Sequence, residues 1–316
     1  MNKKFIIIIV AIIAIIGVAG AYSFFSSDSD DGIVKVGYLP SDHDSALFVA
    51  QVDKAYEEKG ITIETIQFNN GGDLMTAMAS GDVDVGYVGI TPVLSSIEKG
   101  VPVKVVSGAQ IEGSGIVVGK DSNINSVNDL KGKSIATPGE ASIQYMLLQY
   151  ALKDAGMTID DVDASAMKVA PMNDALAGGK IDAMLTYEPY VTTAVEKGQG
   201  IELEDSSEIL PDHPCCVVVA RDDFINDNPD ELKSILEIHD NSTNYINENP
   251  EEAAEKLPEN VASDVEIEKK SLPNIKFVSG LDDDYKKSIM DFMQIEIDMG
   301  LLKEPIPEDK IFYSPK

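Results

Sequence analysis

The sequence predicts an α/β protein of two similar lobes with mostly parallel sheets, joined by a two-strand hinge and preceded by an N-terminal hydrophobic segment. Three observations support this prediction: a long internal repeat, a regular alternation of apolar runs with helical segments, and two crossings between the halves. Alternating strands and helices are typical of parallel sheets covered by helices on both faces. The 316 residues are enough for two such lobes.

The N-terminus is typical of an exported protein. Lys3 and Lys4 precede an apolar run of 18 residues from Phe5 to Tyr22. A basic start before such a run is typical of a signal peptide, and this length also lies at the short end of what spans a bilayer. We therefore expect residues 1–22 to be a signal peptide or membrane anchor and residues 23–32 a polar linker. The protein is then at the outer face of the cell membrane, or secreted or periplasmic.

The charge balance excludes one class of partner. The chain carries 54 acidic and 25 basic residues, which give a net charge of -29. A surface this negative repels nucleic acid, and Arg221 is the one arginine of the sequence. A basic groove for DNA or RNA is therefore excluded.

An internal repeat divides the chain. Four short segments recur in the same order at an offset of 96 to 98 residues. Each match is weak alone, but their common order indicates two copies of one lobe, because the period is too long for a solenoid. The pairs are KVGYLP (35–40) with KSIATP (133–138), GITI (60–63) with GMTI (156–159), AMASGDVD (77–84) with ALAGGKID (175–182), and EKG (98–100) with EKG (196–198).

Both copies predict the order strand, helix, strand, short helix, strand. Gly60 and Gly156 follow the first helix of each copy, as expected just beyond a helix end. The first copy has strands at 33–38, 62–68 and 83–88 and helices at 46–59 and 73–80; the second has strands at 134–136, about 166–169 and 181–186 and helices at 143–155 and 173–177.

Two crossings set the expected lobe boundaries. The chain leaves the first lobe near 108–117 and returns through 211–219. We assign residues 33–112 and 214–316 to lobe 1 and residues 113–213 to lobe 2. The last third is expected to be mostly helical, with helix starts at Pro229 and Pro250 and a long amphipathic segment at 282–301.

Five motifs carry a family resemblance: VGYLP (36–40), EEKG (57–60), SGDVDVGYVGITP (80–92), NDLKGKSIATPG (128–139) and DAMLTYEP (182–189). With them the chain, over about residues 34–250, resembles the substrate-binding proteins of ABC importers for sulfonate, taurine, nitrate and thiamine-precursor-like compounds. The resemblance implies the type II periplasmic-binding-protein fold and a small solute held between the lobes. It also implies an ABC permease and ATPase as partners of a monomeric binding protein that is not an enzyme.

Ligands of open α/β sheets bind beyond the carboxyl ends of the strands. Several loops expected there also begin helices, whose free N–H groups hold an anionic oxygen without any arginine. We therefore expect an anionic or zwitterionic, sulfonate-like solute, and acidic side chains nearby suit a solute that also carries an amine. The candidate ligand-binding residues are Asp42, His43, Asn70, Gly71, Tyr87, Glu112, Thr137, Ser142, Tyr187 and Glu188.

Two alternatives remain open. Cys215 and Cys216 lie at a place comparable to the cysteine-rich stretch of a thiamine-pyrimidine synthase class, with His213 as a possible base. Adjacent strand residues point to opposite faces, however, so at most one thiol is expected to face the cleft. The spacing predicts neither a disulfide framework nor a metal site, and we expect no cofactor. The second alternative is a ligand-sensing ectodomain.

Overall fold

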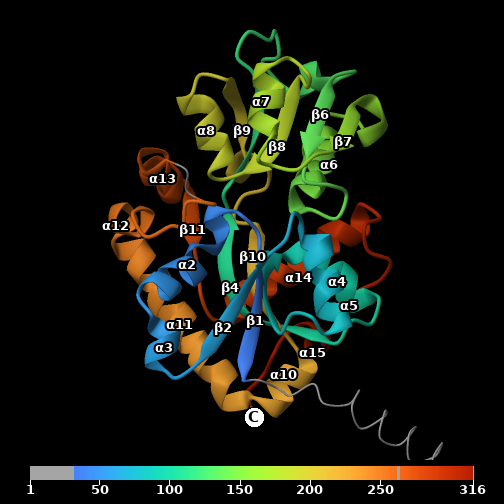
Figure 1. The fold of residues 1–316 in the computed structure, drawn as a ribbon. Coiled ribbons are helices and arrows are strands. Elements are labelled where there is room, and N and C mark those ends of the chain that lie inside the picture. Colours follow the sequence, from blue (N-terminus) through green and yellow to red (C-terminus); the bar gives the residue numbers. More distant parts are fainter. Residues whose placement is uncertain (1–31, 262–263, 316) are drawn as a thin grey trace, which may run out of the picture. The chain divides into compact units, whose positions relative to one another are not determined.

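The computed structural model describes residues 32–261 and 264–315, which form two mixed β-sheets with helices packed against them (Figure 1). The expected signal peptide or anchor at 1–22, and the linker except for residue 32, lie outside the described residues. Within the described ranges, no helix has the length and apolar character needed to cross a bilayer.

The first sheet has six strands in the order β11-β4-β10-β3-β1-β2. Its strands are β1 (Ile33–Tyr38), β2 (Thr62–Gln67), β3 (Val85–Gly89), β4 (Val103–Glu112), β10 (Pro214–Arg221) and β11 (Ile275–Phe277). The accompanying helices are α2 (Ser45–Val52), α3 (Ala55–Glu58), α4 (Gly71–Ser80), α5 (Ile90–Glu98), α10 (Asp222–Asp227), α11 (Pro229–Glu248), α12 (Pro250–Ala254), α13 (Val265–Ser271), α14 (Asp283–Asp298) and α15 (Glu308–Ile311), with the 3-10 turns η1 (Asp42–Asp44) and η4 (Leu272–Asn274).

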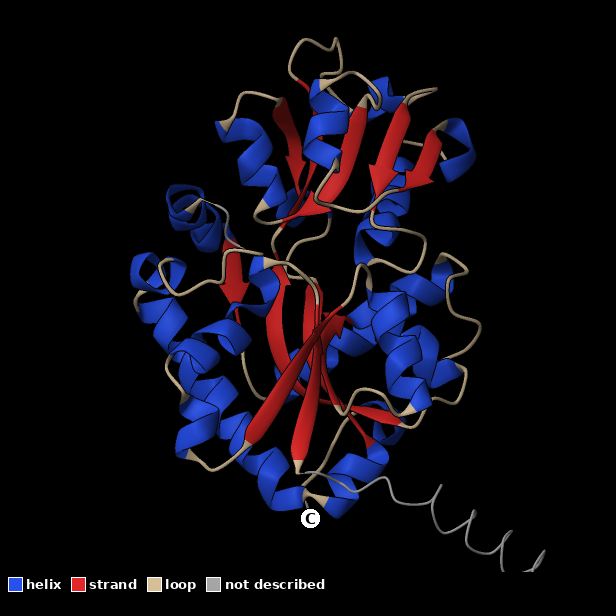
Figure 2. Ribbon diagram, viewed as in Figure 1, coloured by secondary structure: helices blue, strands red, loops and turns tan. Residues whose placement is uncertain are grey.

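The second sheet has five strands in the order β7-β6-β8-β5-β9 (Figure 2). Its strands are β5 (Ser114–Gly119), β6 (Ser134–Thr137), β7 (Asp163–Ala166), β8 (Ala183–Tyr187) and β9 (Gly200–Asp205). Its helices are α6 (Ile143–Asp154), α7 (Met172–Ala177), α8 (Tyr190–Glu196) and α9 (Ser206–Ile209), with the 3-10 turns η2 (Val127–Leu130) and η3 (Ile159–Asp161).

The sheets are mixed, whereas the sequence predicted mostly parallel ones. The repeated units do pair in parallel, β1 with β3 and β6 with both β7 and β8. In contrast, β10 is antiparallel to β3 and β4, and β5 is antiparallel to β8 and β9. The hinge explains this difference. A strand that arrives from the other sheet enters at the carboxyl ends of the parallel strands, so it must run opposite to them.

Two predicted elements differ in their bounds. The helix expected at 46–59 is broken into α2 and α3, because Lys54 adopts a left-handed conformation with φ of 59°. The strand expected near 166–169 lies earlier, as β7, where it pairs with β6. Three of its four residues are exposed and the fourth is half-buried, so an edge strand of this kind carries no apolar pattern that a sequence reading can detect. The helix starts at Pro229 and Pro250 are confirmed.

Candidate ligand-binding pocket

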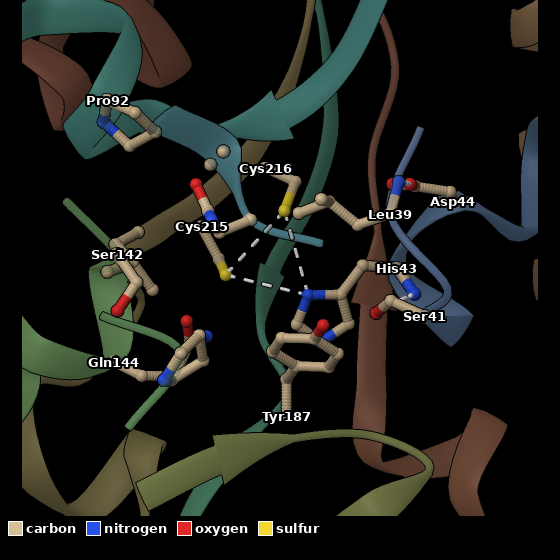
Figure 3. Close-up of a pocket in the computed structure, with 15 residues that line it drawn as sticks. Leu39, Ser41, His43, Asp44, Pro92, Ser142, Gln144, Tyr187, Cys215 and Cys216 are labelled. Carbon is tan, nitrogen blue, oxygen red and sulfur yellow. Dashed lines mark hydrogen bonds between the residues drawn. The ribbon is translucent and has the colours of Figure 1, made fainter. Parts of the chain in front are cut away.

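A pocket lies at the carboxyl ends of the parallel strands and receives residues from both sheets (Figure 3). Its cavity volume is about 30 Å³, which is room for one or two water-sized groups. We call the contribution of the six-stranded sheet the first wall and that of the five-stranded sheet the second wall. The first wall is Leu39, Ser41, His43, Asp44, Asn70, Gly71, Gly89, Pro92, Cys215 and Cys216, and the second wall is Pro138, Ser142, Ile143, Gln144 and Tyr187.

A larger hollow of about 1050 Å³ lies at the opposite end of the six-stranded sheet, near Lys104, Asp222 and Phe312. Lys104 lies near the start of β4, Asp222 begins α10 directly after β10, and Phe312 is in the C-terminal segment. Because ligands of α/β sheets bind at the carboxyl ends of parallel strands, the smaller pocket is the better candidate site.

The loop after β1 positions His43 in the first wall. The Ser41 hydroxyl accepts a hydrogen bond from the His43 N–H at 3.1 Å, and the Asp44 carboxylate accepts one from the Leu39 N–H at 2.9 Å. On the ring, Nε2 donates to the Gly113 carbonyl at 2.8 Å. This bond occupies Nε2 and leaves Nδ1 facing the pocket.

Both cysteine side chains face His43, which corrects the expectation that strand alternation would turn one thiol away. Figure 3 shows the two sulfurs directed toward the imidazole. The Cys215 and Cys216 sulfurs lie 3.7 and 3.6 Å from His43 Nδ1 and 4.0 Å from each other. The register of β10 against β4 shifts on both sides of Cys216, and such irregularities break the two-residue alternation of a strand.

Burial and proximity set the ionisation of this cluster. Burial opposes the thiolate of Cys215, but the Cys216 thiol and the His43 imidazole outweigh it and lower the pKa of Cys215. The same contact with Cys215 and the burial of the thiol raise the pKa of Cys216. Burial lowers the pKa of His43, yet the charge of Cys215 and hydrogen bonds raise it overall. Cys215 is therefore the more acidic thiol.

The acidic group of the first wall is Asp44. Burial raises the pKa of Asp44 to about 8, against the opposing hydrogen bond from Leu39 and the charge of His43. The carboxyl group is therefore mostly protonated at neutral pH, so this wall presents little fixed negative charge to a solute.

The second wall is built around the start of α6 and the end of β8. The Ser142 hydroxyl caps α6 by accepting from the Tyr145 N–H at 3.1 Å, and the Gln144 amide donates to the Ser114 hydroxyl at 3.0 Å. The Tyr187 ring lies 5.5 Å from the His43 ring. Its buried hydroxyl has no hydrogen-bond partner among the described residues.

Direct contacts join the two sides beside the pocket. The Glu188 carbonyl, which precedes a cis bond to Pro189, accepts from the Ser41 hydroxyl at 3.2 Å and from the Asp42 N–H at 3.3 Å. The Glu188 carboxylate accepts from the Asn274 amide at 3.0 Å. Burial raises the pKa of Glu188 to about 7, although hydrogen bonds from Asn274 and Thr192 act in the opposite direction. Hydrogen bonds around Glu188 therefore add to the ring contact between Tyr187 and His43 in joining the two lobes.

The structure brings together half of the candidate residues in the pocket lining: His43, Asn70, Gly71, Ser142 and Tyr187. Asp42 and Thr137 are buried beside the pocket without lining it. Tyr87, Glu112 and Glu188 also do not line the pocket, and each has other partners.

The partners of these last three residues explain their positions. The Tyr87 hydroxyl bonds to His239 of α11 at 3.1 Å, since its side chain lies on the helix-covered face of β3. The Glu112 carboxylate accepts from the Asp212 N–H at 2.8 Å and pairs with Lys276 at 3.1 Å. Glu188 binds Thr192 and Asn274 rather than facing the cavity.

Sequence reasoning missed ten lining residues as individuals, although the strand-end loops contain most of them. The feature with no sequence signal is the cluster of His43 with both thiols. These residues are 172 and 173 positions apart, and the fold alone makes them neighbours. The missed lining residues are Leu39, Ser41, Asp44, Gly89, Pro92, Pro138, Ile143, Gln144, Cys215 and Cys216.

The known sequences that are similar to this chain include both binding proteins and an enzyme. The chain is 29% identical to a putative binding protein of Brucella abortus, over 70% of this chain and 69% of that protein. It is 31% identical to the taurine-binding periplasmic protein of Escherichia coli, over 59% and 58%. It is 29% identical to the 4-amino-5-hydroxymethyl-2-methylpyrimidine phosphate synthase of Schizosaccharomyces pombe, over 60% and 58%.

Solved structures confirm the predicted fold. The periplasmic aliphatic sulphonate binding protein of Escherichia coli superposes with a TM-score of 0.76 at 17% identity, covering 90% of this chain and 93% of that one. The alkanesulfonate-binding protein of Xanthomonas axonopodis pv. citri bound to MOPS gives 0.78 at 18% identity, covering 89% and 98%. The two-sheet architecture is thus that of periplasmic binding proteins. The profile of the NMT1-like family matches residues 28–259, and the chain therefore belongs to that family.

Proposed function

We propose that this protein is the extracytoplasmic solute-binding component of an ABC importer. One observation carries the proposal: the pocket is lined from both sheets and lies beside the two chain crossings. A site divided in this way is suited to capture by closure, because both walls contact the solute only when the lobes meet. We take residues 33–112 with 214–316 as one lobe and residues 113–213 as the other.

The proposed solute is small and anionic or zwitterionic, of the sulfonate type. Two helices from opposite lobes, α4 and α6, begin at the pocket with Gly71 and Ile143. Free N–H groups at a helix start favour an anionic oxygen. Asp44, mostly protonated at neutral pH, would repel such a group little. Relatives named as taurine-binding and sulphonate-binding proteins support the same chemical class.

The size of the cavity implies that the lobes separate before a solute enters. A volume of about 30 Å³ is smaller than any alkanesulfonate. The polar contacts between the lobes include hydrogen bonds around Glu188, a bond from the Tyr190 hydroxyl to the Pro40 carbonyl and an ion pair of Lys270 with Glu196, and each hydrogen bond contributes only about 1 kcal/mol net. Opening through the two crossings is therefore energetically accessible.

The importer partners would be a permease and an ATPase, with this protein acting as a monomer outside the cell membrane. Relatives named as periplasmic or binding proteins support an extracytoplasmic location. Mass spectrometry of the N-terminal peptide tests the mode of attachment. A peptide that retains Lys3 and Lys4 in the membrane fraction means an anchor, whereas a mature start at Tyr22 or later means cleavage.

The experiment that tests solute capture is a thermal-shift screen with taurine, alkanesulfonates, nitrate, bicarbonate and pyrimidine precursors. A solute at 100 times its dissociation constant stabilises the folded state by about 2.7 kcal/mol. The solute giving the largest rise in melting temperature is then titrated by calorimetry. Small-angle scattering should show a smaller radius of gyration when it is added. A constant radius together with binding would contradict capture by closure.

An enzyme related to the pyrimidine phosphate synthases is the second candidate. The observation in its favour is the contact between an acidic thiol and an imidazole at Cys215 and His43, because this pair is also the arrangement of a nucleophile and its base. The same solute separates the two proposals. Recovery of unchanged solute after prolonged incubation supports a binding protein, and conversion detected by mass spectrometry supports an enzyme.

A further inference from the structure

The cluster of His43, Cys215 and Cys216 offers three ligand atoms to one point. One nitrogen and two sulfurs lie within 4.8 Å of one another, and all three side chains are buried. Nitrogen from histidine and sulfur from cysteine are the ligands preferred by soft cations such as Zn(II) and Cu(I). The three residues come from the loop after β1 and the start of β10, which also line the pocket, so solvent has a path to them.

The distances already match those of a coordinated cation. For a cation about 2.3 Å from each sulfur and about 2.0 Å from the nitrogen, trigonal angles place the sulfurs about 4.0 Å apart and each sulfur about 3.7 Å from the nitrogen. Tetrahedral angles reduce these separations to about 3.8 and about 3.5 Å. The observed separations are 4.0 Å between sulfurs and 3.7 and 3.6 Å to Nδ1. A cation therefore fits the triangle without movement of the backbone.

The imidazole is oriented as a ligand by its second nitrogen. His43 Nε2 donates to the Gly113 carbonyl at 2.8 Å, and a metal-binding histidine commonly donates its other N–H to a carbonyl in this way. Gly113 also allows the close approach. A Cβ at this position would lie 2.8 Å from His43 Nε2, and the residue has a φ of +78°. The backbone thus holds the Nδ1 lone pair toward the two sulfurs.

Two further polar side chains border the same cluster. His213 Nδ1 donates to the Leu210 carbonyl at 2.7 Å, so Nε2 carries a lone pair, and this buried nitrogen has no hydrogen-bond partner among the described residues. Gln110 is the cross-strand neighbour of Cys216, and its buried amide is also without a partner in the described part of the chain. Each of these side chains lies beside one of the two thiols, His213 beside Cys215 and Gln110 beside Cys216, so His213 Nε2 is available to a bound cation as a further ligand.

We propose that His43, Cys215 and Cys216 form a binding site for one thiophilic d¹⁰ cation, Zn(II) or Cu(I), in the wall of the pocket. Cu(I) is satisfied by the three ligands, whereas Zn(II) takes a fourth, from His213, water or the solute. Zn(II) binding forms two metal–sulfur bonds and one metal–nitrogen bond, and it releases to solvent the two protons that the cluster holds on its thiols, or on Cys216 and His43 when Cys215 is ionised. No electron is transferred, because copper is supplied already as Cu(I). The site rests on side-chain geometry and does not require the proposed solute.

The test uses the purified full chain, reduced, freed of metal and confirmed to hold two free thiols. Zn(II) is titrated in competition with a chromogenic zinc indicator, and Cu(I) anaerobically in competition with a chromogenic Cu(I) chelator. We expect one equivalent of at least one of the two cations to bind. The titration that gives the tighter binding identifies the preferred cation. Co(II), as a spectroscopic substitute for Zn(II), should then give thiolate-to-cobalt charge-transfer absorbance.

Matched variants locate the site. His43→Ala, Cys215→Ser and Cys216→Ser should each weaken binding by about 100-fold or more, since loss of an outer contact alone costs about 10- to 100-fold. His239→Gln is the control, because His239 is a buried histidine that bonds to Tyr87 away from the pocket. Circular dichroism checks that each variant is folded.

Two results would overturn the proposal. One is the lack of stoichiometric binding of both cations by the reduced natural chain. The other is undiminished binding by a Cys215→Ser, Cys216→Ser double variant. The thermal-shift screen is run in parallel on metal-free protein. A solute that binds the metal-free protein supports the proposed function even when no metal binds.

Discussion

The two walls of the pocket are built on repeated units, with Cys215 and Cys216 added to the first wall from β10 outside the repeat, and they carry different chemistry. The first wall places an imidazole, two thiols and a carboxyl group together in a buried cluster. The second wall offers a hydroxyl, an amide and a phenol, which are neutral hydrogen-bonding groups. A duplicated scaffold therefore fixes where the walls lie, while the residues at the strand ends decide what each wall does. We infer that the first wall provides the ionisable and metal-binding groups, and that the second wall closes over them.

The largest expected effect concerns the support of the first wall. Gly113→Ala should destabilise the protein by about 2–4 kcal/mol, because the new Cβ would lie 2.8 Å from His43 Nε2 in a left-handed backbone. Gly156→Ala is the matched control. Gly156 has a similar φ of +74° with nothing within 4 Å of the added Cβ, so it should cost only about 1–2 kcal/mol. Urea unfolding measures both, and equal costs would mean that His43 is not held by this contact.

The second effect is a pH dependence at the junction of the walls. Burial raises the pKa of Glu188 from 4.5 to about 7, so the folded state holds a proton that the unfolded state has lost. The stabilisation is complete below pH 4.5 and disappears as pH rises through about 7, by up to about 3 kcal/mol. Glu188→Gln removes the titration, so its unfolding free energy should fall less between pH 5 and 8 than that of the natural protein. Parallel curves for the two proteins would exclude Glu188 as the titrating group.

A third effect tests whether the second wall contacts solute. The Tyr187 hydroxyl is buried without a partner among the described residues, and its removal in Tyr187→Phe should leave the melting temperature of the free protein equal or slightly higher. Affinity for the solute found in the screen should fall about tenfold, the value of one hydrogen bond. Tyr150→Phe on α6 is the control, since Tyr150 does not line the pocket. If calorimetry gave the same solute affinity for Tyr187→Phe and Tyr150→Phe, the Tyr187 hydroxyl would not contact the solute.

The smallest expected effect is on stability, when the thiols are removed. Replacing both Cys215 and Cys216 with alanine should cost only about 1–2 kcal/mol, because each loses one buried sulfur atom and neither residue is disulfide-bonded in this structure. The same variant should lose the metal site completely. A much larger fall in melting temperature, reproduced by adding reductant to the natural protein, would instead show that a vicinal disulfide stabilises the first wall.

The architecture of the protein follows from patterns along its sequence. Its repeat located two α/β units, and its glycine and proline signals placed helix ends and starts such as those at Gly60, Pro229 and Pro250. It also located the loops that line the pocket, because the carboxyl ends of parallel strands share one edge. These features depend on local residue patterns and on the order of the elements, and both can be inferred from the sequence.

The side chains that meet in the pocket depend instead on long-range packing. Strand alternation predicted opposite directions for Cys215 and Cys216, and a register shift against β4 turned both sulfurs toward His43. A bulge depends on the partner strand, so no periodicity in the sequence reports it. The direction of the connecting strands was likewise set by the hinge, since a strand entering from the other lobe must run against its neighbours. Sequence patterns fix which edge of a sheet is functional, and long-range packing fixes which side chains meet there.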